Sequence, residues 1–238
     1  MTAALAAAGL AVVVVALVDL AWTTVAAGSG AGPISGRLAA GLWRAALAVH
    51  RRRPSHTLLS VAGVSTVFSV LALWIGLVLA GWLLVFAASD GAVRVSQTSE
   101  PADLVGRAYF VGYSVFTLGN GDYRPGAGLW QLATVLAAGT GLVLVTLSIT
   151  YLVPVASAVA LRRQLASTVT ALGSTPQEIV TTAWDGHAFT GLSRRLVDLG
   201  ALIETSRQQH LTYPVLHYFH SRSPDSAAAP NLTNLTHA

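Results

Sequence analysis

The sequence has no cysteine and no lysine, and only 10% of its 238 residues are charged. Without cysteine the chain has no disulfides, thiolate metal sites or cysteine nucleophiles, although the redox compartment stays open. All 14 basic residues are arginine, which favours a GC-rich bacterial genome. Soluble domains are about a quarter charged. This chain, 53% hydrophobic, must therefore place much of its length in lipid.

The sequence contains long apolar runs without charged residues, apart from one aspartate. Three of them, residues 3–27, 57–87 and 128–158, are long enough to cross a bilayer. The first lacks a preceding basic region and is longer than a signal-peptide core, so we interpret it as a span. Asp19 interrupts this run near its end. Its carboxylate could meet an arginine or a helix N-terminus there, or it could form part of a functional site.

Arginines indicate the topology. Residues 28–57 contain five arginines and no acid, in an amphipathic pattern typical of an interfacial helix. Nucleic-acid binding is another use of a basic patch, but the neighbouring spans favour the rule that cytoplasmic loops are positive. Arg162 and Arg163 follow the last run. Both basic segments are therefore expected in the cytoplasm, and the polar loop 88–103 outside.

The segment after that polar loop is too short to cross the membrane again. Residues 100–103 are acidic, contain a proline and have the character of a helix start. Residues 104–116 then allow roughly three to four helical turns, which is about half a span. Non-helical backbone is tolerated at membrane depth only where it is buried in protein or lines a wet cavity. We therefore expect a re-entrant helix followed by a loop.

The loop reads T-L-G-N-G-D over residues 117–122. Gly119 and Gly121 allow positive φ angles, which residues with a Cβ resist. A backbone that alternates such residues with ordinary ones can point successive carbonyl oxygens the same way. Carbonyls from several chains around one axis can then replace the water shell of a cation.

The order of a span, a short helix, T-L-G-N-G-D and another span resembles the pore module of tetrameric potassium channels, whose filter is usually written T-V-G-Y/F-G-D. The resemblance covers residues 58–158 and is greatest to the bacterial two-span channel family, here with an extra N-terminal span. It implies a homotetramer in which each chain supplies a quarter of the filter. The implied filter residues are Thr117, Leu118, Gly119, Asn120 and Gly121.

Two positions depart from the family pattern. Asn120 replaces the aromatic residue that packs behind the filter and holds its diameter. Its amide could hydrogen-bond a neighbour instead, and the candidates are Tyr109, Tyr113 and Asp122. Phe116 stands where many members have a second threonine.

Asp122 is implied to attract cations at the outer mouth or to brace the filter, with a plain turn residue as the alternative. Potassium preference depends on Asn120.

The last apolar run contains candidate hinge or gate residues: Gly139, Gly141 and Pro154. Gly141 is close to the place where the family has a flexible glycine, and Gly139 is an equal candidate. Close helix packing through small residues is the alternative for both. Pro154 lacks an N–H and is expected to kink the helix near its cytoplasmic end, where a gate could close.

The tail contains two predicted helices. Thr175 and Glu178 form a capping-box pattern at the first, and apolar residues at helical spacing predict the second over 190–209. We expect disorder after about residue 221. His217 and His220 are three apart and could share a helix face as a metal or pH-sensing pair, although no carboxylate lies near them in sequence.

Together these features predict an all-α membrane protein with three transmembrane helices, a re-entrant pore helix and a helical cytoplasmic tail. Residues 1–57 are expected to form a span with an interfacial helix, 58–158 the pore module, and 159–238 the tail. We expect a potassium-conducting cation channel subunit that forms a homotetramer in the lipid bilayer of a bacterial plasma membrane, with its C-terminus in the cytoplasm.

No cofactor is expected beyond permeant K⁺, and no nucleic-acid partner. A partner of the tail cannot be read from the sequence. No enzymatic activity is expected, because the sequence has no nucleophile–base set and no convincing metal cluster. The alternatives are a weakly selective cation channel, a potassium transporter subunit, or a non-transport membrane scaffold whose re-entrant loop is structural.

Overall fold

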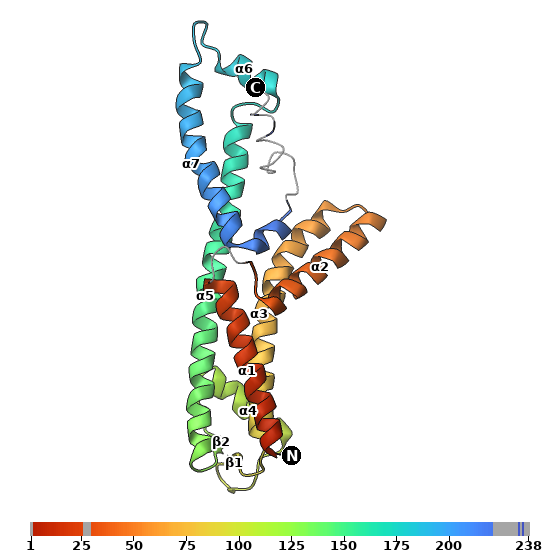
Figure 1. The fold of residues 1–238 in the computed structure, drawn as a ribbon, viewed down its shortest axis with the longest axis vertical. Coiled ribbons are helices and arrows are strands. Elements are labelled where there is room, and N and C mark those ends of the chain that lie inside the picture. Colours follow the sequence, from red (N-terminus) through yellow and green to blue (C-terminus); the bar gives the residue numbers. More distant parts are fainter. Residues whose placement is uncertain (1, 26–29, 221–232, 234, 236–238) are drawn as a thin grey trace. The chain divides into compact units, whose positions relative to one another are not determined.

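The computed structural model describes residues 2–25, 30–220, 233 and 235, and most of them are helical (Figure 1). The helices are α1 (Thr2–Val25), α2 (Pro33–Arg52), α3 (His56–Ala87), α4 (Leu104–Val115), α5 (Leu129–Thr170), α6 (Pro176–Ala183) and α7 (Thr190–Thr212), followed by the 3-10 turn η1 (Pro214–Tyr218). Helices α1, α3 and α5 are long and apolar enough to cross a membrane, as predicted. The protein is an all-α membrane protein.

Two short strands that the sequence did not predict lie in the loops on either side of α4. Strands β1 (Val93–Val95) and β2 (Tyr123–Pro125) pair antiparallel. A ladder of three residues per strand is too short to give a period-two pattern in the sequence. The ladder connects the loop that follows α3 to the segment that precedes α5.

Packing divides the chain into two units. Among the described residues, the first comprises 2–25, 32–35 and 69–151, and the second comprises 30–31, 36–68 and the described residues from 152 onward. Both α3 and α5 contribute residues to each unit. The three-part division expected from the sequence remains a prediction.

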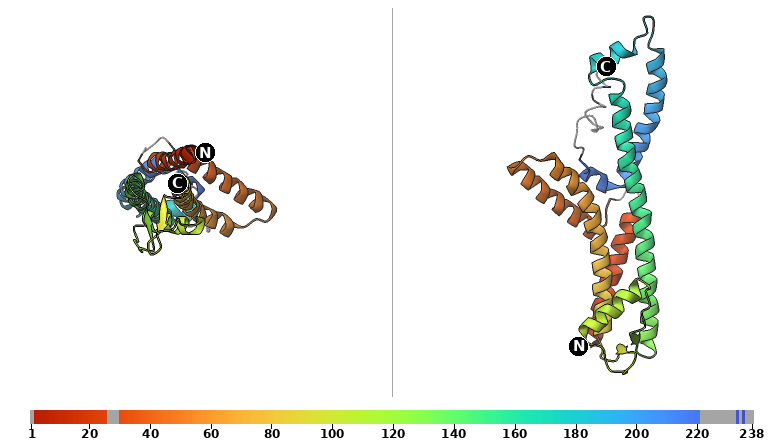
Figure 2. Two further views of the ribbon diagram at one scale, coloured as in Figure 1. Left: turned by 90° about the horizontal axis from the view of Figure 1, so that it is seen from below. Right: turned by 180° about the vertical axis from the view of Figure 1, so that it is seen from behind.

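In the first unit, α1 runs beside α3 (Figures 1 and 2). Glycines allow this approach, because a Cβ at Gly9 would lie 2.5 Å from the carbonyl oxygen of Gly81. The core between the spans and α4 is aromatic. Its largest fully buried side chains include Trp74, Trp82, Phe86 and Phe110.

Asp19 connects α1 to the start of α2. Its carboxylate is 1% exposed and accepts hydrogen bonds from the backbone N–H of Ile34 at 2.8 Å and of Ser35 at 3.2 Å, and from the Ser35 hydroxyl. Helix α2 begins at Pro33, within the basic segment 28–57, and its first N–H groups have no partner within the helix. Trp74 Nε1 donates to the same carboxylate at 2.9 Å. Asp19 therefore meets a helix N-terminus, as one of the two structural alternatives predicted.

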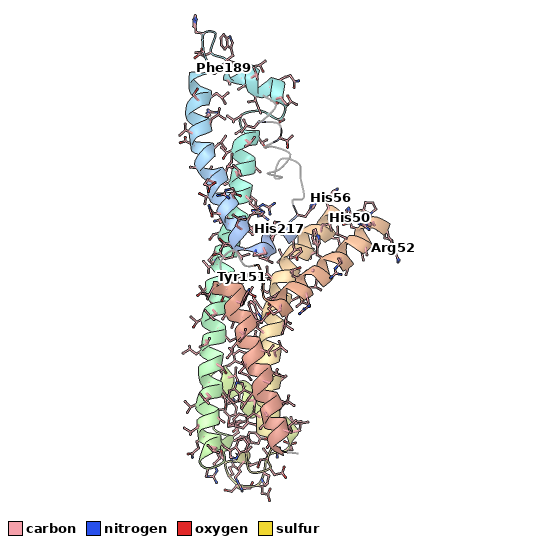
Figure 3. All side chains as sticks on the ribbon, viewed as in Figure 1. His50, Arg52, His56, Tyr151, Phe189 and His217 are labelled. Atoms are coloured by element: carbon pink, nitrogen blue, oxygen red, sulfur yellow. The ribbon has the colours of Figure 1, made fainter. Side chains whose placement is uncertain are left out.

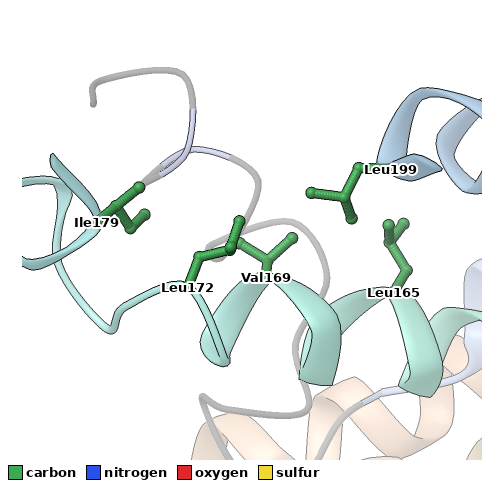
Figure 4. Close-up of a cluster of buried hydrophobic side chains, with 5 residues drawn as sticks. All are labelled: Leu165, Val169, Leu172, Ile179 and Leu199. Carbon is green, nitrogen blue, oxygen red and sulfur yellow. The ribbon is translucent and has the colours of Figure 1, made fainter. Parts of the chain in front are cut away.

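In the second unit, α5 continues to Thr170, past the span end expected near residue 158. No glycine or proline interrupts residues 158–170, so nothing in the sequence ends the helix there. Its last turns, α6 and α7 enclose a buried apolar cluster (Figure 4). The members of this cluster are Leu165, Val169, Leu172, Ile179 and Leu199.

The predicted N-cap of α6 is confirmed, with a small difference. Thr175 Oγ1 accepts from the Glu178 N–H at 3.2 Å. The Glu178 carboxylate accepts from the N–H of Ser174 at 2.8 Å, one residue before the position that a capping box requires. Helix α7 lies close to its predicted range.

The alternative in which His217 and His220 share a helix face is not supported by the structure. Turn η1 ends at Tyr218, so the two residues share no helix face. The ring of His217 lies edge-on to His210 with centroids 5.4 Å apart, whereas His220 stacks on His56 at 5.3 Å. His50 and His56 lie at the facing ends of α2 and α3 (Figure 3). The described residues contain no group of three or more side chains that could hold a metal. Most residues after 221, where disorder was expected, lie outside those described.

Candidate functional site

Helix α4 is fixed at its N-terminal end by Asp103 and Arg107. The Asp103 carboxylate caps the helix by accepting from the Gly106 N–H at 2.8 Å. Arg107 is 8% exposed, donates to the Ala87 carbonyl oxygen at 3.3 Å and pairs with Asp90 at 2.8 Å. It therefore joins the start of α4 to the end of α3. Arg107 was not predicted from the sequence, although a lone arginine in a short apolar helix signals that it needs partners.

The other end of α4 packs on α5 at Gly141. A Cβ at this position would overlap the carbonyl group of Val115, so the contact requires glycine. Gly141 follows Leu129, the first residue of α5, by 12 residues, which is about 18 Å at 1.5 Å per residue. With Leu129 placed at the edge of a hydrocarbon core about 30 Å thick, α4 would end near the middle of the membrane. This depth agrees with a re-entrant helix.

The loop that leaves α4 has an alternating backbone. Thr117, Gly119 and Gly121 have φ angles of +57°, +63° and +82°, while Leu118 and Asn120 between them do not have positive φ. The positive φ expected of the two glycines is confirmed. Thr117 was not foreseen, because a β-branched residue resists this region. Such strain is found most often in functional segments.

Four carbonyl groups of this loop are free. In the part of the chain that the structure describes, the carbonyl oxygens of residues 117–120 accept no hydrogen bond. The next two are held: Gly121 O accepts from the Ser96 hydroxyl at 2.6 Å, and Asp122 O accepts from the Ser96 N–H at 3.0 Å. Carbonyls at membrane depth are costly unless water or a cation solvates them. Hydrogen bonds thus hold the loop at Gly121 and Asp122. The carbonyl oxygens of residues 117–120 have no such bond within the described residues and can coordinate a water or a cation.

Side chains brace the outer end of the loop. The amide of Asn120 donates to the hydroxyl of Tyr109 on α4, and that hydroxyl donates to the Asp122 carboxylate at 3.3 Å. Of the three partners considered for Asn120, Tyr109 is the one that it contacts directly. Residues 116–122 are exposed on the single chain, apart from these contacts.

A cavity of about 320 Å³ lies between α4, the loop and α5. Its lining includes Tyr113 and Ser114 of α4, Gly119 and Gly121 of the loop, and Thr134 of α5. The Ser114 hydroxyl is buried and has no hydrogen-bond partner in the described part of the chain. No large side chain of the loop fills this space, as expected when asparagine replaces the family's aromatic residue.

The hinge and gate candidates lie on α5. A Cβ at Gly139 would meet nothing within 4 Å, whereas Gly141 is in direct contact with α4. Pro154 lies inside the continuous α5 helix. The structure therefore brings Gly141 to the end of α4, but not Gly139 or Pro154. Their roles in gating remain predictions.

Comparison with known proteins shows what this arrangement is similar to. Residues 73–158 match a family model described as an ion channel. The chain is 38% identical over 214 residues to the uncharacterized membrane protein YdjJ of Bacillus subtilis (strain 168), a match that covers 90% of this chain and 62% of YdjJ. The chain thus spans about three fifths of that relative's length. No solved structure matches the chain. Over residues 73–158, the arrangement of α4 and its loop between two spans is therefore similar to that ion-channel family.

Proposed function

We propose that the chain is one subunit of a passive cation channel and that its permeant cation is K⁺. The loop 117–121 carries this proposal, because its φ angles alternate and four of its carbonyl groups accept no hydrogen bond in the described part of the chain. Carbonyl oxygens arranged in this way suit a dehydrated monovalent cation. The negative end of the α4 dipole, at Val115, adds to the attraction.

The proposed assembly is a homotetramer. One chain supplies one loop, and a ring of carbonyls around a cation requires several copies with closed symmetry. The single chain exposes an apolar surface along α5 that neighbouring subunits and lipid can cover. Its large exposed side chains include Leu132, Val135, Leu136, Leu142, Ile149 and Val153.

Two observations bear on selectivity. The hydrogen bonds from Asn120 to Tyr109 and on to Asp122 support a loop of defined width. The cavity of about 320 Å³ beside the loop favours a looser one. We infer that K⁺ is preferred because the hydrogen bonds act on the loop itself, and a weakly selective cation channel is the alternative.

The proposed topology has α2 and the tail in the cytoplasm of a bacterial cell and the β1–β2 ladder outside. Arginines support it, because they cluster in α2 and again at Arg162 and Arg163. A potassium transporter subunit is disfavoured by the single copy of the loop in this chain, since such transporters usually repeat it four times. A membrane scaffold would leave the open carbonyl groups without a role. No enzymatic reaction is proposed.

Uptake of Rb⁺ and Na⁺ into liposomes that contain the purified protein tests the proposal. We expect Rb⁺ uptake to exceed Na⁺ uptake and to be lost in Gly119→Ala, because alanine resists a φ of +63°. Gly76→Ala is the matched control, since a Cβ there meets nothing within 4 Å and α3 tolerates alanine.

Each other outcome is informative. Equal uptake of Rb⁺ and Na⁺ would assign the chain to weakly selective channels. A folded tetramer without flux in either variant or in the parent protein would favour the scaffold.

A further inference from the structure

Two arginines face each other across the β1–β2 ladder. Arg94 and Arg124 are register partners on the two strands. The side chains of directly opposed residues in an antiparallel pair project from the same face of the ladder. Like charges placed there destabilise the pairing. This arrangement therefore calls for a compensating negative group.

Ser99 holds the two guanidinium groups in place but does not neutralise them. Arg94 Nη1 donates to the Ser99 carbonyl oxygen at 2.9 Å, and Arg124 Nη2 donates to the Ser99 hydroxyl at 2.5 Å. Ser99 has a φ of +61°, which residues with a Cβ rarely adopt, and in this conformation both of its oxygens meet the arginines. A guanidinium has five N–H donors, so most donors of each arginine remain available.

The acids of the same loops are engaged elsewhere or exposed. Asp90 is ion-paired at the start of α4, Asp103 caps that helix, and Asp122 accepts from a tyrosine hydroxyl. Glu100 is exposed. Among the described residues, no ion pair joins an acid to either arginine of the ladder. None of these acids is paired with Arg94 or Arg124, so both guanidinium groups can bind a negative group from outside this chain.

Both arginines line an open pocket of about 450 Å³ together with Ser99, Gly126 and Gln131. Gln131 lies in the first turn of α5, a helix long and apolar enough to cross a membrane. Its neighbours Leu129 and Leu132 are 80% and 62% exposed. Cationic donors next to exposed leucines at the end of a span match the boundary between lipid headgroups and acyl chains.

We propose that Arg94 and Arg124 bind a phosphate group, and that its source is the phosphodiester of an anionic phospholipid in the leaflet around the start of α5. The planar fork of a guanidinium matches two phosphate oxygens, and the headgroup charge offsets the two opposed arginines. The acyl chains cover Leu129 and Leu132. This site does not depend on the proposed ion conduction, because none of its residues belongs to the loop 117–121.

Retention of phosphatidylglycerol tests the proposal. The full chain is reconstituted in vesicles of equal phosphatidylglycerol and phosphatidylcholine and extracted in detergent, and the retained lipid is counted by native mass spectrometry. We expect phosphatidylglycerol to be enriched, and the enrichment to fall about five-fold in Arg124→Gln and again in the double variant with Arg94→Gln. Arg44→Gln, which removes one charge from the interfacial helix α2, is the matched control and should keep the enrichment.

A second arm separates lipid from free phosphate. Inorganic phosphate is added to the delipidated protein in detergent, and its melting temperature is measured. Phosphate stabilisation that depends on Arg94 and Arg124, with no enrichment of phosphatidylglycerol, would overturn the lipid source. An enrichment that Arg44→Gln reduces equally would overturn the site, because generic surface charge would then explain it. If Arg94→Gln does not fold, the exposed Arg124 still provides the test.

Discussion

The side-chain amide of Asn120 donates a hydrogen bond to the hydroxyl of Tyr109, which in turn donates to the carboxylate of Asp122. One tyrosine of α4 thereby holds the two residues on either side of Gly121. An aromatic residue at position 120 would hold the loop by filling volume behind it. Here polar contacts brace the loop, and the side-chain contacts of Asn120 and Asp122 both meet at one hydroxyl group.

Tyr109→Phe removes that hydroxyl and keeps the ring. We expect the preference of liposome uptake for Rb⁺ over Na⁺ to decrease, because both hydrogen bonds are lost. The melting temperature should change little, since the ring keeps its contact with Tyr113 and Tyr109 is 43% exposed. Tyr218→Phe removes a hydroxyl from the tail and should leave the preference unchanged. An unaltered preference in Tyr109→Phe would show that the brace does not set the width of the loop.

Gly141→Ala and Gly139→Ala separate packing from flexibility on α5. A Cβ at Gly141 overlaps the Val115 carbonyl group, so this variant should lose about 1–3 kcal/mol of stability through overpacking. A Cβ at Gly139 meets nothing within 4 Å, and alanine there should leave the stability equal or higher. Unfolding in a graded denaturant measures both variants. Flux lost in Gly139→Ala without a loss of stability would instead identify Gly139 as a hinge.

The parts of the fold that depend on local pattern were predictable from the sequence. Apolar run length gave the three spans, and the run that was too short to span gave α4. The glycines gave the positive φ angles at 119 and 121. Each of these features follows from residues that lie close together in the chain, where propensity and spacing act directly.

The remaining features depend on contacts between distant segments. Arg107 reaches Asp90 on the other side of a polar loop, and Arg94 meets Arg124 through a ladder without a visible period. The histidine pair joins residues 56 and 220, which no helical spacing relates. Thr117 adopts a conformation that its own side chain disfavours, so local propensity predicted the opposite.

Asp19→Asn tests the joint between α1, α2 and α3. The buried carboxylate accepts from two backbone N–H groups of α2 and from Trp74, and an amide can satisfy fewer of these donors. We expect the free energy of unfolding to decrease by about 1–3 kcal/mol. Asp198→Asn, at an exposed position of α7, is the control and should change stability by less than about 0.5 kcal/mol. Equal stability of the two variants would contradict a structural role for Asp19.

The contact between His56 and His220 predicts a response to acid. Their ring nitrogens lie 3.0 Å apart, so at least one of the two must lack a proton. Burial lowers the pKa of His220 below its ordinary 6.5, and the charges of His56 and His50 lower it further.

When the segment that carries His220 leaves His56, the imidazole of His220 regains its ordinary pKa. At low pH it then binds more protons than it does in the docked state, in which the two rings are in contact. The docked state is therefore most stable above pH 6.5 and loses stability as the pH falls below that value. Hydrogen exchange at the amides of Leu216 and Phe219, corrected for the intrinsic rate, should be faster at acidic pH. His220→Gln should weaken this dependence, and the part that remains is expected from His210, whose pKa burial also lowers. His187→Gln, at an exposed position, should retain the full dependence. Exchange that stays independent of pH in the parent protein would show that protonation does not release the contact.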